Sequence, residues 1–424
     1  MNNHYDVIIA GGGMVGASLA MALSRQLSSP LRIAIVEGFS MPQSTNSEPV
    51  YRPSFDARST ALAAGARQVF EHFGLWATLA EHVQPINNIH VSRVARPGSM
   101  VMDAGHEKLD ALGYVVENQW LGGVLLADVQ QCHNVEFICP ASVEKITPLS
   151  SGHCVKVRDK SNDTIATLTA KLVVIADGTE SPLAQSLGIH YQRRCYQASA
   201  IVANVSSAKP HKGWAFERFT SSGPMAMLPL TNGSGGETRS ALVWSQPDAE
   251  VEYWLNCGKA AFLAKLQRDF GYRLGRLTDV GERFSYPLQL VEASEQVRTG
   301  LVVMGNAAHL LHPVAGQGFN LALRDVLALA KTIDQAQRQG QDWASLAVLK
   351  GYLALQAQDQ WMTTTFSDRL PDVFASQSPL LSLLSSIGLT GLDIAAPLRK
   401  NFVLRAAGLT QSREQMFEMA KAEF

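Results

Sequence analysis

The fold of this chain is decided by the stretch VIIAGGGMVG, residues 7–16. Its apolar half predicts a buried strand, and the small residues of 17–27 predict a helix that packs closely behind the glycine turn. A second apolar run, residues 32–36, predicts another strand and ends at Glu37. Strand, helix and strand form a complete βαβ unit, which is the building block of an open parallel sheet.

The glycines of this turn have the spacing G-x-G-x-x-G. Gly11 would make the tight turn, Gly13 would let the backbone reach a pyrophosphate, and Gly16 would let helix and strand pack closely. Glu37 stands where an acid accepts hydrogen bonds from a ribose 2′-OH and repels a 2′-phosphate. The spacing alone is weak evidence, but with both strands, the helix and the terminal acid it predicts a dinucleotide whose adenosine ribose is unphosphorylated.

Composition limits the class of protein. The chain has 424 residues, of which 46% are hydrophobic, enough for a sizeable core in about two or three domains. Lys and Arg number 36 against 37 Asp and Glu, which leaves no basic stripe for nucleic acid. Five scattered cysteines without a Cys-x-x-Cys pair indicate reduced thiols and no metal site. Since the N-terminus has no signal-peptide pattern, we expect a cytoplasmic protein.

A further buried strand is predicted at residues 172–176, followed directly by Asp177 and Gly178. Asp177 would lie at the carboxyl end of a parallel strand, where open α/β sheets bind their ligands. This position favours a functional carboxylate. The alternative is that Asp177 only caps the short helix expected after Pro182.

Another apolar strand is predicted at residues 301–304. It leads into Gly305, Asn306 and a turn rich in proline and glycine. A helix follows, with apolar spacing from Leu321 onward. Gly316 and Gly318 would let backbone N–H groups approach a ligand, and the positive end of the helix would favour an anion or an electron-rich ring. An ordinary glycine-rich loop is the alternative interpretation.

The predicted fold class is α/β: a Rossmann-like binding domain with an inserted, mostly antiparallel β-sheet domain for the substrate and a C-terminal helical region. The binding domain is discontinuous because the nucleotide-binding pattern returns after a long stretch of alternating strands. We predict these boundaries: residues 1–75, 104–188 and 292–340 for the binding domain, 76–103 and 189–291 for the substrate domain, and 341–424 for the helical region.

Helices are also expected at residues 55–73 and 249–270. Residues 380–389 form a strongly apolar patch, which indicates either core packing or contact with a membrane or a partner. Polar residues interrupt the surrounding stretch 379–397, which is too polar for a confident membrane span.

The three motifs, in this order, resemble the group A flavoprotein aromatic hydroxylases, which share the para-hydroxybenzoate hydroxylase fold. Four shorter stretches are similar to the ubiquinone-biosynthesis hydroxylases: residues 55–62, 215–219, 223–229 and 312–320. The resemblance covers nearly the whole chain. It implies FAD as cofactor, NAD(P)H as electron donor, O2, and a polyprenylated phenol as substrate.

The resemblance assigns roles residue by residue. The glycines 11, 13 and 16 would hold the FAD pyrophosphate, and Glu37 the adenosine ribose. The flavin side would be bound by residues spread along the chain: Arg58, Asn118 or Gln119, Asp177, Asn306, Gly316, Gln317, Gly318 and Asn320. The residues expected at the reacting carbon are His312, Pro313 and Gly318. For Arg58, an exposed arginine paired with Asp56 is the alternative.

Two positions depart from the family pattern. Asn306 stands where members commonly have aspartate, although its side chain can still accept a hydrogen bond from the ribityl chain. Ala184 stands where the second motif usually has a basic residue. As is usual for this family, the single βαβ unit offers no separate NAD(P) domain.

The activity that the resemblance implies is hydroxylation of the ring of 2-polyprenyl-6-methoxyphenol in ubiquinone biosynthesis, through a flavin C4a-hydroperoxide formed from NAD(P)H and O2. A flavin-dependent reductase of an isoprenoid or quinone, with the same fold, is the alternative. A non-enzymatic scaffold in a ubiquinone-synthesis assembly is a third. The expected location is cytoplasmic, with peripheral contact to the inner membrane.

Two sets of side chains near the predicted site have two readings each. His309 and His312 are either acid/base groups or loop histidines satisfied by their neighbours. Four apolar residues either wall the opening for the prenyl tail or pack in the core: Phe216, Phe219, Met225 and Met227.

Overall fold

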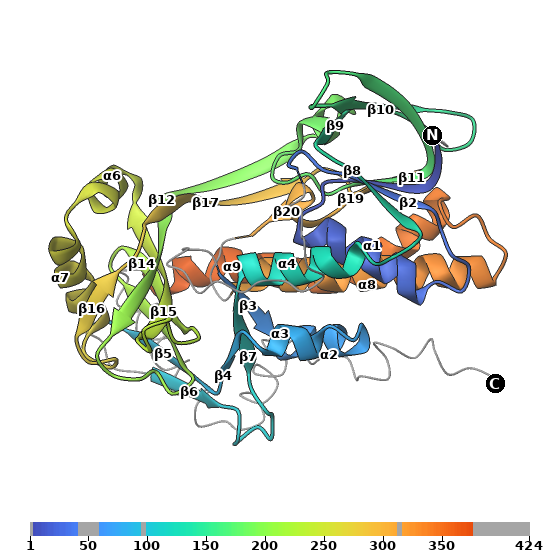
Figure 1. The fold of residues 1–424 in the computed structure, drawn as a ribbon. Helices are drawn as coiled ribbons and strands as arrows, with labels where there is room; N and C mark the ends of the chain where they lie inside the picture. The colour runs from blue at the N-terminus through green and yellow to red at the C-terminus, as the bar shows by residue number, and fades with distance from the viewer. Residues whose placement is uncertain (1–2, 41–58, 95–98, 312–315, 376–424) are drawn as a thin grey trace.

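The computed structural model describes residues 3–40, 59–94, 99–311 and 316–375 (Figure 1). Two large sheets lie at opposite ends of the molecule. Two strands run from one end to the other, β12 (Tyr191–Ser207) and β17 (Phe284–Ala293). A long helix, α9 (Leu346–Ala375), and its neighbour α8 (Gln317–Arg338) lie beneath them in this view.

The first sheet has eight strands, and its centre is the predicted parallel βαβ core. In the order β19, β11, β1, β2 and β8, its strands are Leu301–Val303, Ile165–Ile175, His4–Ala10, Ile33–Val36 and Val135–Ile138. Antiparallel strands extend it: β18 (Val297–Arg298), β9 (Ala141–Pro148) and β10 (His153–Asp159).

Both faces of the first sheet are buried, which explains its continuous apolar runs. Val7 and Ile9 of β1 pack toward α1 (Met14–Gln26), α4 (Asn118–Val129) and α8. Ile8 and Ala10 pack on the opposite face, against strands β9 and β10 and helix α5 (Pro182–Ser186).

The second sheet has nine strands and is mostly antiparallel. Besides β12 and β17 it contains β5 (Asn88–Arg93), β6 (Ser99–Asp103), β13 (Trp214–Thr220), β14 (Gly223–Pro229), β15 (Thr238–Pro247), β16 (Leu277–Val280) and β20 (His309–Leu310). Where one helix was predicted, two cover this sheet: α6 (Asp248–Asn256) and α7 (Lys259–Phe270). The extended backbone of Cys257 and Gly258 separates them.

A three-stranded sheet lies between the two large ones. It is built from β3 (Ser59–Ala63), β7 (Gly113–Glu117) and β4 (Val83–Ile86), and α2 (Ala64–His72) and α3 (Trp76–Ala80) follow in the chain. The helix predicted over 55–73 is therefore wrong at residues 59–63, because these residues pair with β7 along their whole length. Long-range pairing outweighs the helix propensity of its alanines.

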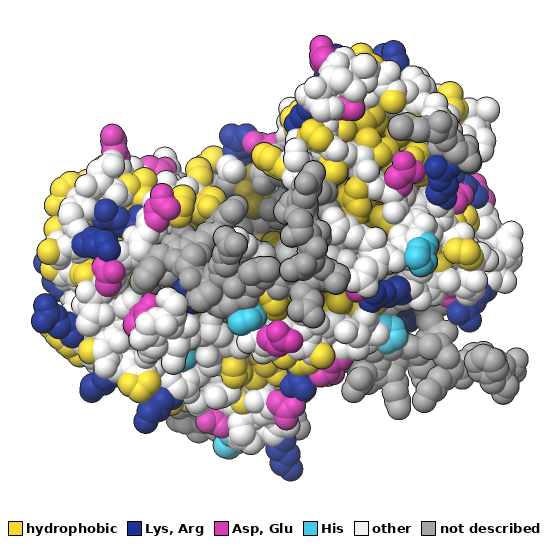
Figure 2. Space-filling view, viewed as in Figure 1, with side chains coloured by type: hydrophobic (Ala, Val, Ile, Leu, Met, Phe, Trp, Pro, Cys, Tyr) yellow, Lys and Arg dark blue, Asp and Glu magenta, His cyan; other side chains and the backbone are white. Residues whose placement is uncertain are grey.

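The C-terminal helical region is described as far as α9, which packs along α8. Arg324 of α8 pairs with Asp359 of α9 at 2.6 Å. The apolar patch at 380–389 lies outside the described residues, and the division into domains stays a prediction. Within the described ranges, no helix combines the length and apolar character needed to cross a membrane. Acidic and basic side chains are interspersed on the face shown in Figure 2.

Candidate functional site

The predicted motifs meet at one edge of the first sheet. Ala10 is in register with Val36 on one side and with Ile175 on the other, and Ile175 is in register with Val303. These four strands are parallel, so their carboxyl ends point the same way. The residues that follow them therefore share this edge: Gly11, Glu37, Asp177 and Asn306.

The glycine turn has two positions that exclude a side chain and one that leaves room. Gly11 has a φ of +108°, and a Cβ there would clash with the carbonyl oxygen of Ala176. A Cβ on Gly16 would clash with the carbonyl of Gly11. A Cβ on Gly13 would meet no described atom within 4 Å, and no side chain caps α1 there. The N–H groups of the first turn can therefore bind an anion.

Glu37 lies directly beside this turn. Its Oε2 accepts a hydrogen bond of 2.6 Å from the Gly12 N–H, and its Oε1 accepts one of 3.0 Å from the Phe39 N–H. The carboxylate is thus fixed at the end of β2, facing the turn. Its oxygens can accept further hydrogen bonds, as a ribose hydroxyl requires.

Asp177 does not cap α5. The Ser181 hydroxyl does so, accepting a hydrogen bond of 2.9 Å from the Ala184 N–H and donating one of 2.8 Å to Asp177 Oδ2. Desolvation by the surrounding chain raises the pKa of the Asp177 carboxyl, and the hydrogen bond from Ser181 acts against this. Burial, with a smaller contribution from Asp177, raises the pKa of Tyr191 to about 12.

The turn after β19 packs against α1. Gly305 has a φ of +63°, and a Cβ there would lie 3.1 Å from the Val15 side chain. The Tyr191 hydroxyl donates a 2.8 Å hydrogen bond to the carbonyl of Ala307, the last residue of the short helix η1 (Gly305–Ala307). These contacts hold Asn306, whose side chain is exposed, beside the glycine turn.

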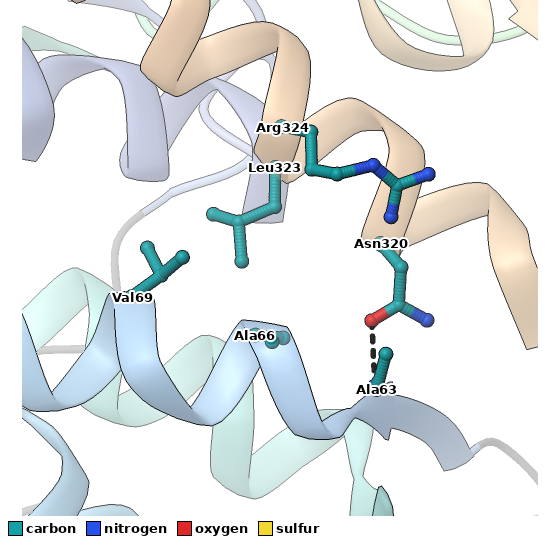
Figure 3. A pocket seen from close by; sticks show the side chains of 7 residues that line it. Ala63, Ala66, Val69, Asn320, Leu323 and Arg324 are labelled. Atoms are coloured by element: carbon teal, nitrogen blue, oxygen red, sulfur yellow. Dashed lines mark hydrogen bonds between the residues drawn. The ribbon is translucent and has the colours of Figure 1, made fainter. Parts of the chain in front are cut away.

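The start of α8 is fastened to β3. Gly316 has a φ of +59°, and a Cβ there would lie 2.9 Å from the Ala61 side chain. The buried Asn320 amide accepts from the Ala63 N–H (Figure 3) and donates to the carbonyls of Ala61 and Gly316, at 2.8, 2.8 and 2.9 Å. Asn320 thus shapes the loop through the backbone. The space beside it in Figure 3, about 10 Å³, holds no more than a water molecule.

The first turn of α8 resembles that of α1. No side chain caps it, and a Cβ on Gly318 would meet no described atom within 4 Å. Gln317 is partly exposed. The two helices also pack against each other (Figure 1), so two uncapped helix N-termini serve the same region. Both favour negative charge or the electronegative edge of a ring.

The N-terminus of α4 adds the last predicted residues. The Thr60 hydroxyl of β3 donates a 2.6 Å hydrogen bond to Asn118 Oδ1, and Gln119 is exposed. Glu117, just before this helix, pairs with the Arg239 guanidinium of β15 at 3.3 Å, and both side chains are buried. The pair joins the second sheet to the three-stranded sheet at the site.

Three predicted site residues, Arg58, His312 and Pro313, lie outside the described residues. His309 is described and is 5% exposed. Its Nε2 lies 3.4 Å from Asp325 Oδ2 of α8, and Asp325 accepts a 3.1 Å hydrogen bond from Gln360 of α9. His309 is therefore buried, but its Nε2 has no hydrogen-bond partner among the described residues, so neither interpretation of this histidine is settled by its contacts.

The apolar residues expected along the substrate opening divide between two faces of β13. Phe216 packs with Met225 and Met227 against α7, so these three side chains belong to the core. The core-packing interpretation therefore applies to Met225 and Met227, whereas Phe216, which is 8% exposed, also lines a pocket on this face. Phe219 is buried and, by strand alternation, lies on the opposite face.

Glu217 is a titratable residue on that opposite face which sequence reasoning did not single out. It is in register with Val91 of β5 and Ala226 of β14. Burial raises its pKa to about 8, and no donor of a hydrogen bond to its carboxyl lies among the described residues. A single acid between Ala215 and Phe219 in a half-buried strand is the signal that could have revealed it.

The chain is similar in sequence to a protein family and to several known proteins. The family described as an FAD binding domain matches residues 4–354. A ubiquinone hydroxylase, UbiL, of Rhodospirillum rubrum is 33% identical over 403 residues, covering 95% of this chain and 89% of that protein. The 3-demethoxyubiquinol 3-hydroxylase of Escherichia coli is 30% identical over 412 residues, covering 96% of this chain and 100% of that protein.

Solved structures show the same fold. The structure of pqsL, a probable FAD-dependent monooxygenase from Pseudomonas aeruginosa, superposes with a TM-score of 0.73 at 22% identity, over 92% of this chain and 100% of that one. The predicted fold class is therefore confirmed.

Proposed function

Since the chain belongs to the FAD-binding-domain family and is an FAD-dependent monooxygenase, we propose that it hydroxylates the ring of a polyprenylated phenol in ubiquinone biosynthesis. The substrate we favour is 2-polyprenyl-6-methoxyphenol. The observation that carries the proposal is the 33% identity to a ubiquinone hydroxylase over 95% of the chain. The family resemblance of residues 215–219 and 223–229, both in the second sheet, supports it.

The residues at the sheet edge fit FAD. The uncapped first turn of α1 at Gly13 would hold the pyrophosphate, and Glu37 the adenosine ribose. Asn306 and Asn118 would lie along the flavin side of the cofactor. The first turn of α8 at Gly318 would face the ring, where its N–H groups stabilise negative charge. Bound FAD supplies the transfer of electrons from NADH or NADPH to O2.

The face of β13 that bears Glu217 would receive the phenol. Its neighbours on this face are small or apolar, Ala215 and Ala226 among them, and the apolar cluster there includes Val115 of β7. Such a surface excludes water from the ring, which protects a reactive oxygen donor from hydrolysis. It also suits an apolar substrate better than a carboxylated one.

Glu217 would accept the phenol proton. In this step the phenol O–H bond breaks, the proton passes to the Glu217 carboxylate, and the electron pair stays on the phenolate oxygen. A phenolate ring is richer in electrons and attacks an electrophilic oxygen faster. With a pKa of about 8, the carboxylate is a stronger base than an ordinary one.

A polyprenyl tail makes the substrate a lipid, so we include peripheral contact with the inner membrane in the proposal. Product analysis in cells that lack this protein tests the assignment. We expect such cells to accumulate the unhydroxylated methoxyphenol, and expression of the wild-type chain to remove it. Normal ubiquinone levels with no accumulated phenol would overturn the assignment. A saturated or reduced product would favour the reductase alternative.

A further inference from the structure

A pocket of about 360 Å³ opens on the face of the second sheet that α7 covers. Its lining includes Trp214 and Phe216 of β13 and His90 of β5. Side chains alternate along a strand, so Glu217 points to the other face. The sheet therefore separates this pocket from the proposed phenol site, and the proposed activity gives it no role.

The pocket has an aromatic floor. The rings of Trp214 and Phe216 lie nearly parallel, 6.1 Å apart and 21° inclined, and the His90 ring meets Phe216 edge-on at 6.1 Å. Leu274, in the segment after α7, is an apolar part of the lining. A flat apolar ring of a ligand would find stacking partners here, and the volume lies within the range of small-molecule sites.

The same lining carries positive charge without a matching acid. Lys212 and Arg273 are both exposed and line the pocket, and neither forms an ion pair within the described part of the chain. The only described acceptor for the Arg273 guanidinium is the Phe270 carbonyl, at 3.4 Å. Such cations are free to bind an anionic group on a ligand.

A neighbouring arginine adds to the excess of positive charge around the pocket. Arg218 points to the same face, donating a 2.9 Å hydrogen bond to the Asp269 carbonyl. Burial and then the charge of Arg273 lower the pKa of Arg218, while Asp269 acts the other way. The Asp269 carboxylate already pairs with Lys265 of α7. The positive charges of Arg218 and Arg273 repel each other, and a bound anion would offset this repulsion.

His90 gives an independent sign of a missing partner. Its Nδ1 is shielded from solvent and has no hydrogen-bond partner among the described residues. Burial, followed by Arg273 and Arg218, lowers the pKa of this imidazole. A buried ring nitrogen without a partner costs free energy, which a ligand group or a water molecule in the pocket would recover.

We propose that this pocket binds a small aromatic anion, with its ring on Trp214 and Phe216 and its anionic group at Arg273 and Lys212. The site is distinct from the flavin and phenol sites and would let an aromatic acid bind while the enzyme holds its substrate. Carboxylate and phosphate share the required chemistry, so both are tested.

Titration calorimetry of the FAD-loaded protein with benzoate and with phenyl phosphate tests the proposal. We expect at least one of them to bind, and the two ligands distinguish a carboxylate from a phosphate site. Benzamide lacks the charge and cyclohexanecarboxylate lacks the aromatic ring, so both should bind at least about tenfold more weakly. No binding of either anion at millimolar concentration would overturn the proposal.

Variants place the binding in this pocket. Arg273→Gln should weaken it by about tenfold or more, the loss expected for a charge-assisted hydrogen bond. Arg276→Gln is the matched control, because Arg276 is exposed nearby but does not line the pocket. Trp214→Leu should also weaken binding. Equal affinity in wild type and Arg273→Gln would mean that the anion binds elsewhere, and the proposal would be rejected.

Discussion

The Asn320 amide oxygen accepts a 2.8 Å hydrogen bond from the Ala63 backbone N–H, although 257 positions separate the two residues. With the Nδ2 bonds to Ala61 and Gly316, this contact ties the start of α8 to β3. Asn320 therefore holds the start of α8, which would face the flavin, and it does so without needing to contact the flavin.

Replacing Asn320 should loosen that loop. Asn320→Leu removes the side-chain hydrogen bonds to the Ala63 N–H and to the carbonyls of Ala61 and Gly316, so we expect a loss of about 2–4 kcal/mol in the free energy of unfolding. FAD should bind at least about tenfold more weakly, because the loop is no longer pre-organised. Denaturant unfolding and FAD fluorescence measure the two effects. Gln335→Leu, at an exposed position of the same helix, is the control and should change neither.

The buried pair of Glu117 and Arg239 predicts a different result for single and double variants. Arg239→Met leaves the Glu117 carboxylate buried without its cation and should cost about 3–5 kcal/mol. Adding Glu117→Gln removes the stranded charge and should restore much of that loss. Urea denaturation of the wild type and of these two variants measures this. If the single variant were as stable as wild type, the pair would not join the sheets as described.

Two substitutions in the glycine turn should have different effects, one on folding and the other on FAD binding. Gly16→Ala should destabilise the protein by at least about 2 kcal/mol, because its Cβ would clash with the Gly11 carbonyl. Gly13→Ala has room for its Cβ and should fold normally, but it should bind FAD at least about tenfold more weakly, because that space would be taken by the pyrophosphate. Thermal unfolding of the apoprotein and FAD titration distinguish the two. Tight FAD binding by Gly13→Ala would contradict the assignment.

Glu217 should give activity a pH dependence. As the proton acceptor it works when ionised, so the turnover rate should rise with pH through about 8. Glu217→Gln should lower the rate by about 100-fold or more and remove this rise. Glu282→Gln, at an exposed acid, is the control. A pH profile of the same shape in Glu217→Gln and wild type would exclude Glu217 as the base.

Glu217 should also make stability depend on pH. While the turnover rate rises with pH, the free energy of unfolding should fall. Its folded-state pKa of about 8 lies above the ordinary value of 4.5, so between these values the folded chain binds more protons than the unfolded one. The free energy of unfolding should therefore fall as the pH rises from 4.5 to 8, by on the order of 2 kcal/mol because solvent reaches part of the side chain. In Glu217→Gln this decline should be absent, which thermal unfolding at several pH values measures.

Local patterns were sufficient to predict the centre of the first sheet and its edge. The apolar run before Gly11 predicts its own strand, and parallel strands with short loops at their ends bring Glu37, Asp177 and Asn306 to one place. Each of these inferences needs only neighbouring residues. The family resemblance then identified the ligand of that edge as FAD.

Other features depend on distant pairing, which a local pattern does not contain. Residues 59–63 become a strand because they pair with β7, and Asn320 turns inward because β3 passes beside it. The alternation in β13 is visible in the sequence, but which face α7 covers is not. The sequence therefore leaves Phe216 open between the substrate opening and the core, and it gives no sign that Glu217 is a base.

In the proposed reaction, this chain inserts one atom of O2 into a prenylated phenol. Incubating the purified, FAD-loaded protein with isotopically labelled O2, NADH or NADPH, and a short-chain 2-prenyl-6-methoxyphenol tests it most directly. We predict a hydroxylated product, identified by mass spectrometry, that carries one labelled oxygen on the ring. Oxidation of the nicotinamide with labelled peroxide as the only oxygen product, or a reduced substrate without label, would contradict the claim.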